Sequence, residues 1–248
     1  MRLTILLLAI ATAAPSQLIE EFNPARTNCC LPGAAQNLAD QLKDWNQLGR
    51  YHADNQRLLG RPAPAGRVVF MGDSITDGWK LDRSFPGKPY VNRGISGQTT
   101  PQMLVRMYPD VIDLKPAAMV VLAGTNDIAG NTGPETLKMI ADNIRAMTEL
   151  AQGHGIKVVL CGLLPVSDYT ARPQTARRPP ADVLKLNAWL KQYAAERKAV
   201  YCDYHGALAD SKGMLTDGMS RDGLHPNEQG YEKMVPVVAA AIRQALGK

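Results

Sequence analysis

The sequence has few aromatic residues, few cysteines and no long apolar run. Aromatic residues make up 6% of its 248 residues, and the basic residues behind the net charge of +5 are scattered. A nucleic-acid-binding surface normally combines a basic stripe with aromatic side chains, so this class is disfavoured. The four cysteines do not form two separated ligand pairs, so a zinc site is not expected. No segment reaches the roughly 20 apolar residues that span a bilayer.

The rest of the composition is typical of a globular protein. Hydrophobic residues make up 45% of the chain and charged residues 21%, which excludes disordered, collagen-like and coiled-coil proteins. The length suits one medium α/β domain, whose core needs neither a metal nor a disulfide.

The first 14 residues are typical of a secretory signal peptide. Arg2 precedes an apolar run at residues 3–10, and small residues follow at 11–14. We expect residues 1–14 to be removed and the mature protein to be secreted or periplasmic, without stable insertion in a membrane. The alternative is a frayed apolar helix of a cytosolic protein.

The cysteines fall into two groups. Cys161 and Cys202 lie in strand-like runs, where we expect small buried side chains. Cys29 and Cys30 are adjacent in a loop flanked by proline and glycine, where export permits a disulfide. The sequence does not assign a partner to either.

A proline-rich linker separates two regions after the predicted signal. Residues 34–59 carry leucines and tryptophan at helical spacing, and residues 61–66 break that pattern. We therefore predict a helical extension and linker over residues 15–65, followed by the main domain over residues 66–248.

Short apolar runs alternate with helical stretches in residues 66–248. Strands are predicted at 68–71, 90–92, 119–122, 158–161 and 200–202. Helices are predicted at 99–113, 134–153, 182–197 and 227–246, with a kink or restart at Pro236. This alternation predicts an α/β fold, a three-layer α/β/α sandwich around a parallel sheet with right-handed crossovers.

The loops that follow the strands carry the residues suited to catalysis. Ligands of open parallel sheets bind outside the carboxyl ends of the strands. Ser74 follows the first strand directly, but a serine hydroxyl is a weak nucleophile and needs a base. The candidate base is His225, and Asp222 lies three residues before it, where its carboxylate can reach Nδ1. Taken singly, each of these residues could equally be a helix or turn cap.

An ester-cleaving serine also needs donors for the oxyanion of its tetrahedral intermediate. Gly97 can present a backbone N–H without an obstructing side chain, and Asn126 can donate from its side-chain amide. Both follow predicted strands, so one pocket could collect them.

Four segments together resemble the conserved blocks of the GDSL, or SGNH, hydrolases. They are Gly-Asp-Ser-Ile-Thr at 72–76, and then residues 92–100, 124–127 and 222–226, in the order of that family. The resemblance extends over about residues 66–246, and Ile75 stands where the family commonly has leucine. It implies a flavodoxin-like, five-stranded sandwich.

The resemblance also implies roles for individual residues. Ser74 would be the nucleophile, His225 the base and Asp222 the residue that orients it. The Ser74 amide, Gly97 and Asn126 would form the oxyanion hole. Such acyl transfer requires no metal and no organic cofactor.

The substrate is less well defined by the sequence. Low aromatic content and the lack of an apolar lid favour short acyl groups, above all acetyl, on a saccharide or another small polar molecule. Asp73, Tyr169 and Arg172 are the predicted substrate-binding residues. Arg177 and Arg178, in the same proline-rich loop as Tyr169 and Arg172, could also recognise a polar or anionic group, unless this loop is merely solvated.

Two other functions remain open at this point. A lysophospholipase or acyl-thioesterase of the same family would use the same residues with a different pocket. A non-catalytic carbohydrate-binding module would have no chemical reason to keep the three triad residues together. The sequence assigns no oligomeric state.

Overall fold

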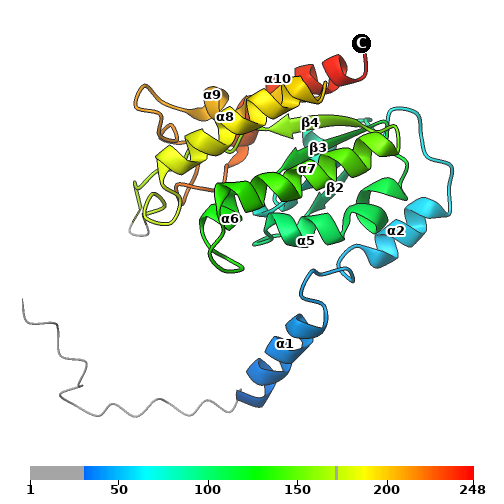
Figure 1. Ribbon diagram of the computed structural model, residues 1–248, viewed down its shortest axis with the longest axis horizontal. Helices are drawn as coiled ribbons and strands as arrows, with labels where there is room; N and C mark the ends of the chain where they lie inside the picture. The colour runs from blue at the N-terminus through cyan, green and yellow to red at the C-terminus, as the bar shows by residue number, and fades with distance from the viewer. Residues whose placement is uncertain (1–30, 171–172) are drawn as a thin grey trace, which may run out of the picture. The chain divides into compact units, whose positions relative to one another are not determined.

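The computed structural model describes residues 31–170 and 173–248 (Figure 1). The predicted signal peptide at 1–14, both Cys29 and Cys30, and Arg172 lie outside the described residues. Contacts divide the chain into two units, residues 1–43 and 44–248. The described part of the first unit is one helix, α1 (Leu31–Lys43).

A parallel sheet of five strands forms the centre of the second unit. The strands are β1 (Val68–Gly72), β2 (Tyr90–Gly94), β3 (Ala118–Leu122), β4 (Lys157–Cys161) and β5 (Val200–Cys202), in the order β2-β1-β3-β4-β5. Every residue of β1 and β3 is buried, which explains their uninterrupted apolar sequences. All five predicted strands are confirmed.

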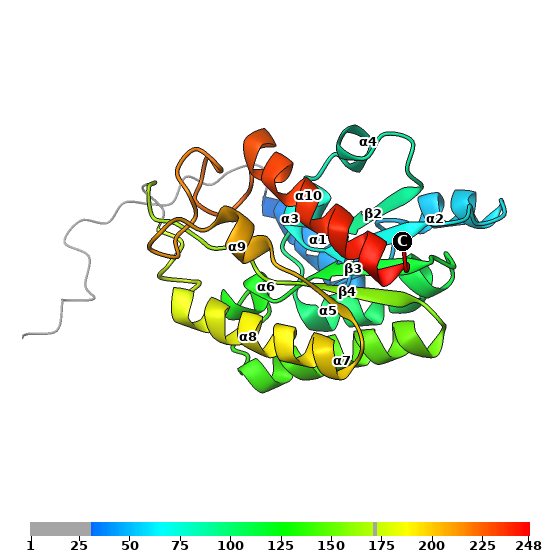
Figure 2. The same ribbon diagram turned by 90° about the horizontal axis from the view of Figure 1, so that it is seen from above.

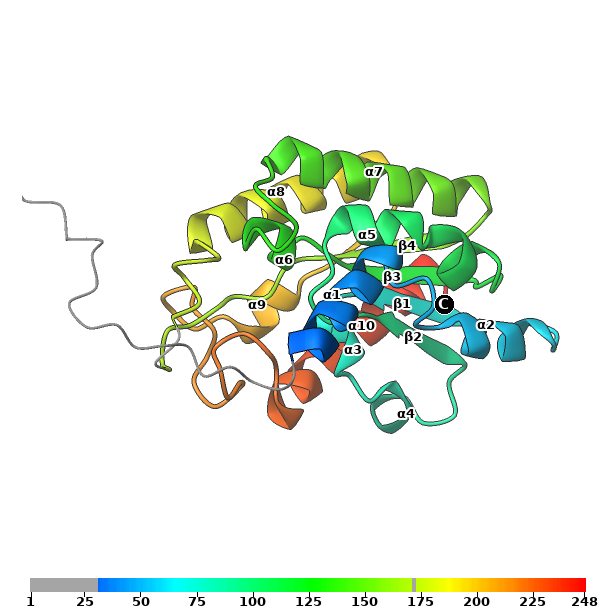
Figure 3. The ribbon, with the colours of Figure 1, turned by 90° about the horizontal axis from the view of Figure 1, so that it is seen from below.

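Helices cover both faces of the sheet. They are α2 (His52–Leu59), α3 (Ser74–Asp77), α4 (Leu81–Ser84), α5 (Thr100–Val105), α6 (Thr125–Ile128), α7 (Leu137–Gly153), α8 (Pro180–Glu196), α9 (Tyr204–Leu208) and α10 (Glu228–Ala245), with a π-helical turn η1 (Tyr108–Ile112). Figures 2 and 3 show α5, α7 and α8 on one face, and α3, α9 and α10 on the other. The predicted three-layer sandwich is therefore confirmed. In the described part of the chain, no helix is long and apolar enough to span a membrane.

Two of the predicted helices differ from the expectation, and each contains a proline. The stretch at 99–113 is divided into α5 and η1, and Pro109, which has no N–H, lies in the first turn of η1. The sequence predicts a kink or a restart at Pro236, and the restart is wrong because α10 continues through this residue. Pro236 and Glu232, whose carbonyl loses its helical partner, are both exposed, so water can solvate that carbonyl.

Residues 44–59 pack as part of the second unit. Asn55 is buried and its side chain bonds Asp110 and Arg93. The side chain of Gln98 donates to the carbonyl of Asn46. The contacts thus place the start of the compact unit before residue 66, because this segment supplies buried hydrogen-bond partners to β2 and the loop after it.

Candidate active site

The loops after β3, β4 and β5 gather with α6 and α9 at the carboxyl end of the sheet (Figure 1). A cavity of about 660 Å³ opens there. Its wall contains all five residues predicted for catalysis and the oxyanion hole, namely Ser74, Gly97, Asn126, Asp222 and His225. A second cavity of about 500 Å³, between α4 and α10, contains none of these side chains.

Ser74 is placed by a tight turn from β1 into α3. The preceding Asp73 caps this helix, since its Oδ1 accepts a hydrogen bond from the Ile75 N–H at 2.9 Å. At Gly94 a Cβ would collide with the backbone of α3 at Asp77. Glycine at this position lets α3 lie directly against β2, and that contact fixes the position of Ser74.

A continuous hydrogen-bond chain joins Ser74, His225 and Asp222. The Ser74 Oγ lies 2.8 Å from His225 Nε2, and His225 Nδ1 lies 2.6 Å from Asp222 Oδ2. The structure therefore brings together residues that are 151 positions apart. In this arrangement Nδ1–H donates to the carboxylate, which leaves Nε2 free to accept the serine proton.

Asp222 is held in place by the turn that connects it to His225. Its Oδ1 accepts from the backbone N–H groups of Leu224 and His225 and from the Ser220 hydroxyl. Burial raises the pKa of Asp222, but the hydrogen bonds from the His225 ring and these backbone groups lower it more, so the net pKa lies well below the usual range. Asp222 is thus ionised and can stabilise a protonated imidazole.

The three predicted oxyanion donors belong to residues that line the same cavity as the Ser74 hydroxyl. The N–H groups of Ser74 and Gly97 have no acceptor among the described residues, and Gly97 adopts a φ of 84°. Asn126 Nδ2 donates one hydrogen to the Gln98 carbonyl at 3.1 Å and retains a second. The donors predicted from the sequence therefore line one cavity.

Arg178 lies behind Asn126 with only 4% of its surface exposed. Its guanidinium donates to Asn126 Oδ1 at 3.1 Å, to Thr125 Oγ1 at 3.2 Å and to Gln174 Oε1 at 3.0 Å. Burial and the charge of Arg177 lower the pKa of Arg178, yet a guanidinium remains charged in proteins.

Of the predicted substrate-binding residues, Asp73 and Tyr169 do not line the cavity. Asp73 is fully buried under α3, so it does not face the cavity. The Tyr169 hydroxyl donates to the Ser220 carbonyl at 3.1 Å, which braces the loop of Asp222 from outside the cavity wall. Arg177, by contrast, lines the cavity, with its guanidinium bonded to Asn131 Oδ1 at 3.0 Å.

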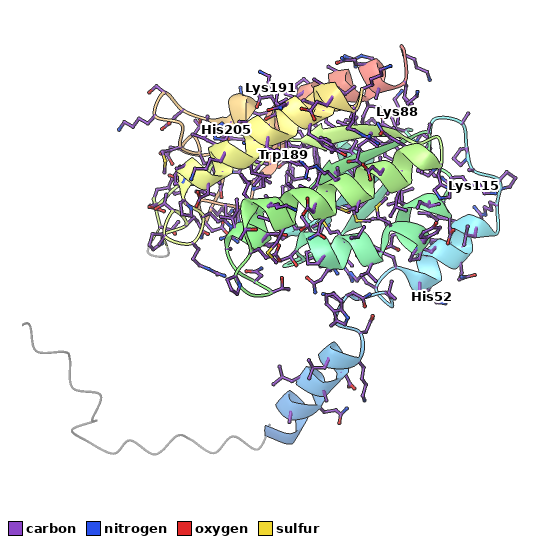
Figure 4. The ribbon with its side chains drawn as sticks, viewed as in Figure 1. His52, Lys88, Lys115, Trp189, Lys191 and His205 are labelled. Atoms are coloured by element: carbon purple, nitrogen blue, oxygen red, sulfur yellow. The ribbon has the colours of Figure 1, made fainter. Side chains whose placement is uncertain are left out.

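Asn131 and Gln174 also line the cavity, although the sequence analysis did not single them out. Both are polar residues in loops after β3 and β4, and this placement was the available signal. His52 on α2 and His205 on α9 lie at opposite ends of the second unit (Figure 4). Neither is in the cavity wall. Within residues 31–170 and 173–248, no group of three or more His, Cys, Asp or Glu could hold a metal.

Comparisons with known proteins find relatives that are described as esterases, lipases or acylhydrolases. Residues 70–233 match the GDSL-like Lipase/Acylhydrolase family. The chain is 26% identical over 239 residues to an acetylxylan esterase from Xylanibacter ruminicola, an alignment that covers 78% of this chain. The chain spans about half the length of that esterase, namely 48%.

Two further proteins extend the comparison. The esterase TesA of Pseudomonas aeruginosa is 28% identical over 187 residues, covering 68% of this chain and 84% of TesA. A GDSL-like lipase structure from Bacteroides thetaiotaomicron superimposes with a TM-score of 0.75 at 36% identity. That superposition covers 82% of this chain and 100% of the lipase.

Proposed function

Because the chain belongs to the GDSL-like lipase/acylhydrolase family, we propose that it is a carboxylic ester hydrolase with Ser74, His225 and Asp222 as its catalytic triad. We further propose that it cleaves short acyl esters, above all acetyl esters, of a saccharide or another small polar alcohol. The observation that carries this proposal is the hydrogen-bond chain from the Ser74 hydroxyl through His225 to Asp222, with distances of 2.8 and 2.6 Å.

The proposed reaction has two acyl-transfer steps. Ser74 Oγ attacks the ester carbonyl while His225 Nε2 takes the hydroxyl proton. The N–H groups of Ser74 and Gly97 and the Asn126 amide donate to the oxyanion. His225 gives the proton to the leaving alcohol, the acyl group remains on Ser74, and a water activated by His225 then releases the acid. Ionised Asp222 stabilises the protonated ring in both steps.

The chemistry of the cavity supports a short acyl group and a polar alcohol. Among the described residues of its wall, the apolar side chains are Pro173 and Leu224. Besides the proposed catalytic and oxyanion-hole residues, polar groups come from Ser96, Asn131, Gln174, Arg177 and Arg178. A long acyl chain would need a continuous apolar channel to offset its hydration. The name of the acetylxylan esterase relative points to the same substrate class.

Replacing the nucleophile tests the assignment of the triad. Ser74→Ala should lower kcat for an acetyl ester by at least about three orders of magnitude, because the acyl-enzyme cannot form. A serine-reactive phosphonate should label Ser74 in the native protein and leave the variant unlabelled, as read by peptide mass spectrometry. Near-normal turnover in the variant would refute the triad.

A series of esters tests the substrate class. We expect kcat/KM to fall from acetyl to butyryl to octanoyl esters of one alcohol, and to be higher for acetylated saccharides than for acetyl-thioesters. Fastest cleavage of octanoyl esters would instead indicate a lysophospholipase. Fastest cleavage of thioesters would indicate a thioesterase, and saccharide binding without turnover a binding module.

A further inference from the structure

Arg178 is a buried cation that has no ion-pair partner among the residues the structure describes. Its three hydrogen bonds all go to neutral oxygens, those of Thr125, Gln174 and Asn126. In the described part of the chain it makes no ion pair, and Asp73 and Asp222 act on its charge only from a longer range. Burying a charge without a paired carboxylate is costly. A buried arginine in such a place therefore needs a compensating role.

The contacts of Asn126 point to that role. The terminal torsion of an asparagine is nearly two-fold, so the oxygen and nitrogen of its amide can exchange places at little intrinsic cost. Arg178 has only donors, so it pairs with Oδ1, and the Gln98 carbonyl is only an acceptor, so it pairs with Nδ2. These two contacts select the orientation in which Nδ2 keeps one free hydrogen for the cavity.

We propose that Arg178 is a positioning residue for the oxyanion hole, holding Asn126 in the orientation whose N–H donates to the oxyanion. This inference rests on the proposed function. In the reversed orientation the amide oxygen would face the developing negative charge and repel it. The guanidinium also polarises the amide to which it is bonded, which strengthens the N–H as a donor in a site of low dielectric.

The proposal differs from substrate recognition by the same arginine. Arg178 is 4% exposed, and its three donor nitrogens are all engaged by the protein. Both arginines contribute to the cavity wall, but Arg177 is exposed whereas Arg178 is buried, so Arg177 is the better candidate for contact with substrate. Loss of Arg178 should accordingly lower kcat rather than raise KM.

A double-mutant cycle with Asn126 tests the proposal. Arg178→Met should lower kcat for an acetyl ester by about 10- to 100-fold with KM changed less than about threefold, since one oxyanion donor contributes about 10²–10³. In the Asn126→Ala background the same substitution should lower kcat less than about threefold, because the amide that Arg178 holds is gone. Equal losses in both backgrounds, or an unchanged kcat in Arg178→Met, would overturn the proposal.

Two further variants separate the possible failures. Arg197→Met, at the opposite end of α8, removes an exposed arginine and should leave kcat unchanged. If Arg178→Met does not fold, the same cycle is run with Arg178→Lys, whose single ammonium cannot make the three bonds, and the same criterion applies. If Asn126→Ala alone leaves kcat unchanged, the proposed oxyanion hole itself fails. If that variant is impaired but the losses are additive, only the role of Arg178 fails.

Discussion

Asp73 carries a buried carboxylate beside Ser74, the proposed nucleophile, and this carboxylate is only partly hydrogen-bonded. Oδ1 caps α3, whereas Oδ2 has no hydrogen-bond partner within residues 31–170 and 173–248. Burial raises the pKa of Asp73 to about 6, and the nearby Asp127 carboxylate adds to this, while the Ile75 N–H acts in the opposite direction. The folded protein therefore keeps Asp73 protonated up to a higher pH than the unfolded chain does.

Asp73→Asn should stabilise the protein at neutral pH. A pKa of about 6 in the folded protein lies above the value of about 3.8 for an unperturbed Asp. The contribution of protonated Asp73 to the free energy of unfolding is therefore fully present below about pH 4 and is lost as the pH rises through about 6. Asparagine keeps the capping oxygen without the charge. The free energy of unfolding of the variant should exceed that of the wild type by up to about 3 kcal/mol at pH 8.

Urea denaturation of both proteins at pH 4 and pH 8 measures this difference. Asp142→Asn is a suitable control, because the hydrogen bond from Lys138 lowers the pKa of that exposed carboxyl. The ionised Asp142 carboxylate stabilises the folded protein above the pKa that it has in the unfolded chain, and this stabilisation is lost in acid. Asp142→Asn should therefore be no more stable than the wild type at pH 8. If the free energies of unfolding of the wild type and Asp73→Asn differed by the same amount at pH 4 and pH 8, the prediction would be contradicted.

At the scale of elements, the site depends on how closely α3 lies against β2. Gly94 is the last residue of β2, and an added Cβ would overlap the backbone of α3. Gly72 at the end of β1 is under a similar constraint, because a Cβ there would meet Thr76 and the Leu122 carbonyl. At Gly94 all the colliding atoms belong to the backbone of α3, which cannot rotate away as a side chain can, so a Cβ there must displace α3.

Gly94→Ala should therefore reduce both stability and turnover. We expect a loss of about 1–3 kcal/mol or more in the free energy of unfolding, and a lower kcat because Ser74 moves with α3. Gly153→Ala is the matched control. No atom lies within 4 Å of a Cβ there, and the residue ends α7 on an exposed surface. Alanine at 153 should stabilise by up to about 1 kcal/mol without changing kcat. An unchanged melting temperature in Gly94→Ala would count against the close-packing argument.

At the scale of the whole molecule, a buried polar network joins α2 to the sheet. Asn55 donates to Asp110 at 2.6 Å and accepts from Arg93 at 3.0 and 2.7 Å. Asp110 also pairs with Arg106, which in turn donates to Gln98 in the loop that carries Gly97. Residues 44–59, which precede the linker, thus support the loop that carries Gly97, a residue of the proposed oxyanion hole.

Asn55→Ala should destabilise the second unit by about 2–4 kcal/mol. The substitution leaves charged groups of Arg93 and Asp110 short of a partner in a buried site, where lost hydrogen bonds are expensive. Denaturant unfolding should show a lower midpoint with an unchanged m-value. Gln192→Ala on α8, which removes an exposed bond to Glu196, should change stability by less than about 0.5 kcal/mol. An equally small effect of Asn55→Ala would mean that the network is not a source of stability.

The sequence by itself determined the strands of the sheet and the types of chemical group at the proposed site. Apolar runs marked all five strands because a strand covered on both faces must be apolar along its whole length. Ser74, Gly97, Asn126, Asp222 and His225 could be named because the carboxyl ends of parallel strands meet at one edge, and their residue types suit acyl transfer.

Only the tertiary structure decided which side chains face the cavity and which support it. Asp73 is buried, Tyr169 braces a loop, and Arg178 contacts Asn126, a residue 52 positions away. Residues 44–59 pack against the main domain through hydrogen bonds of Asn55 to Arg93 and Asp110, which lie far from it in the sequence. Periodicity and capping are local properties that a short window of sequence records. Burial and hydrogen-bond partnership over such separations depend on packing, which no local pattern encodes.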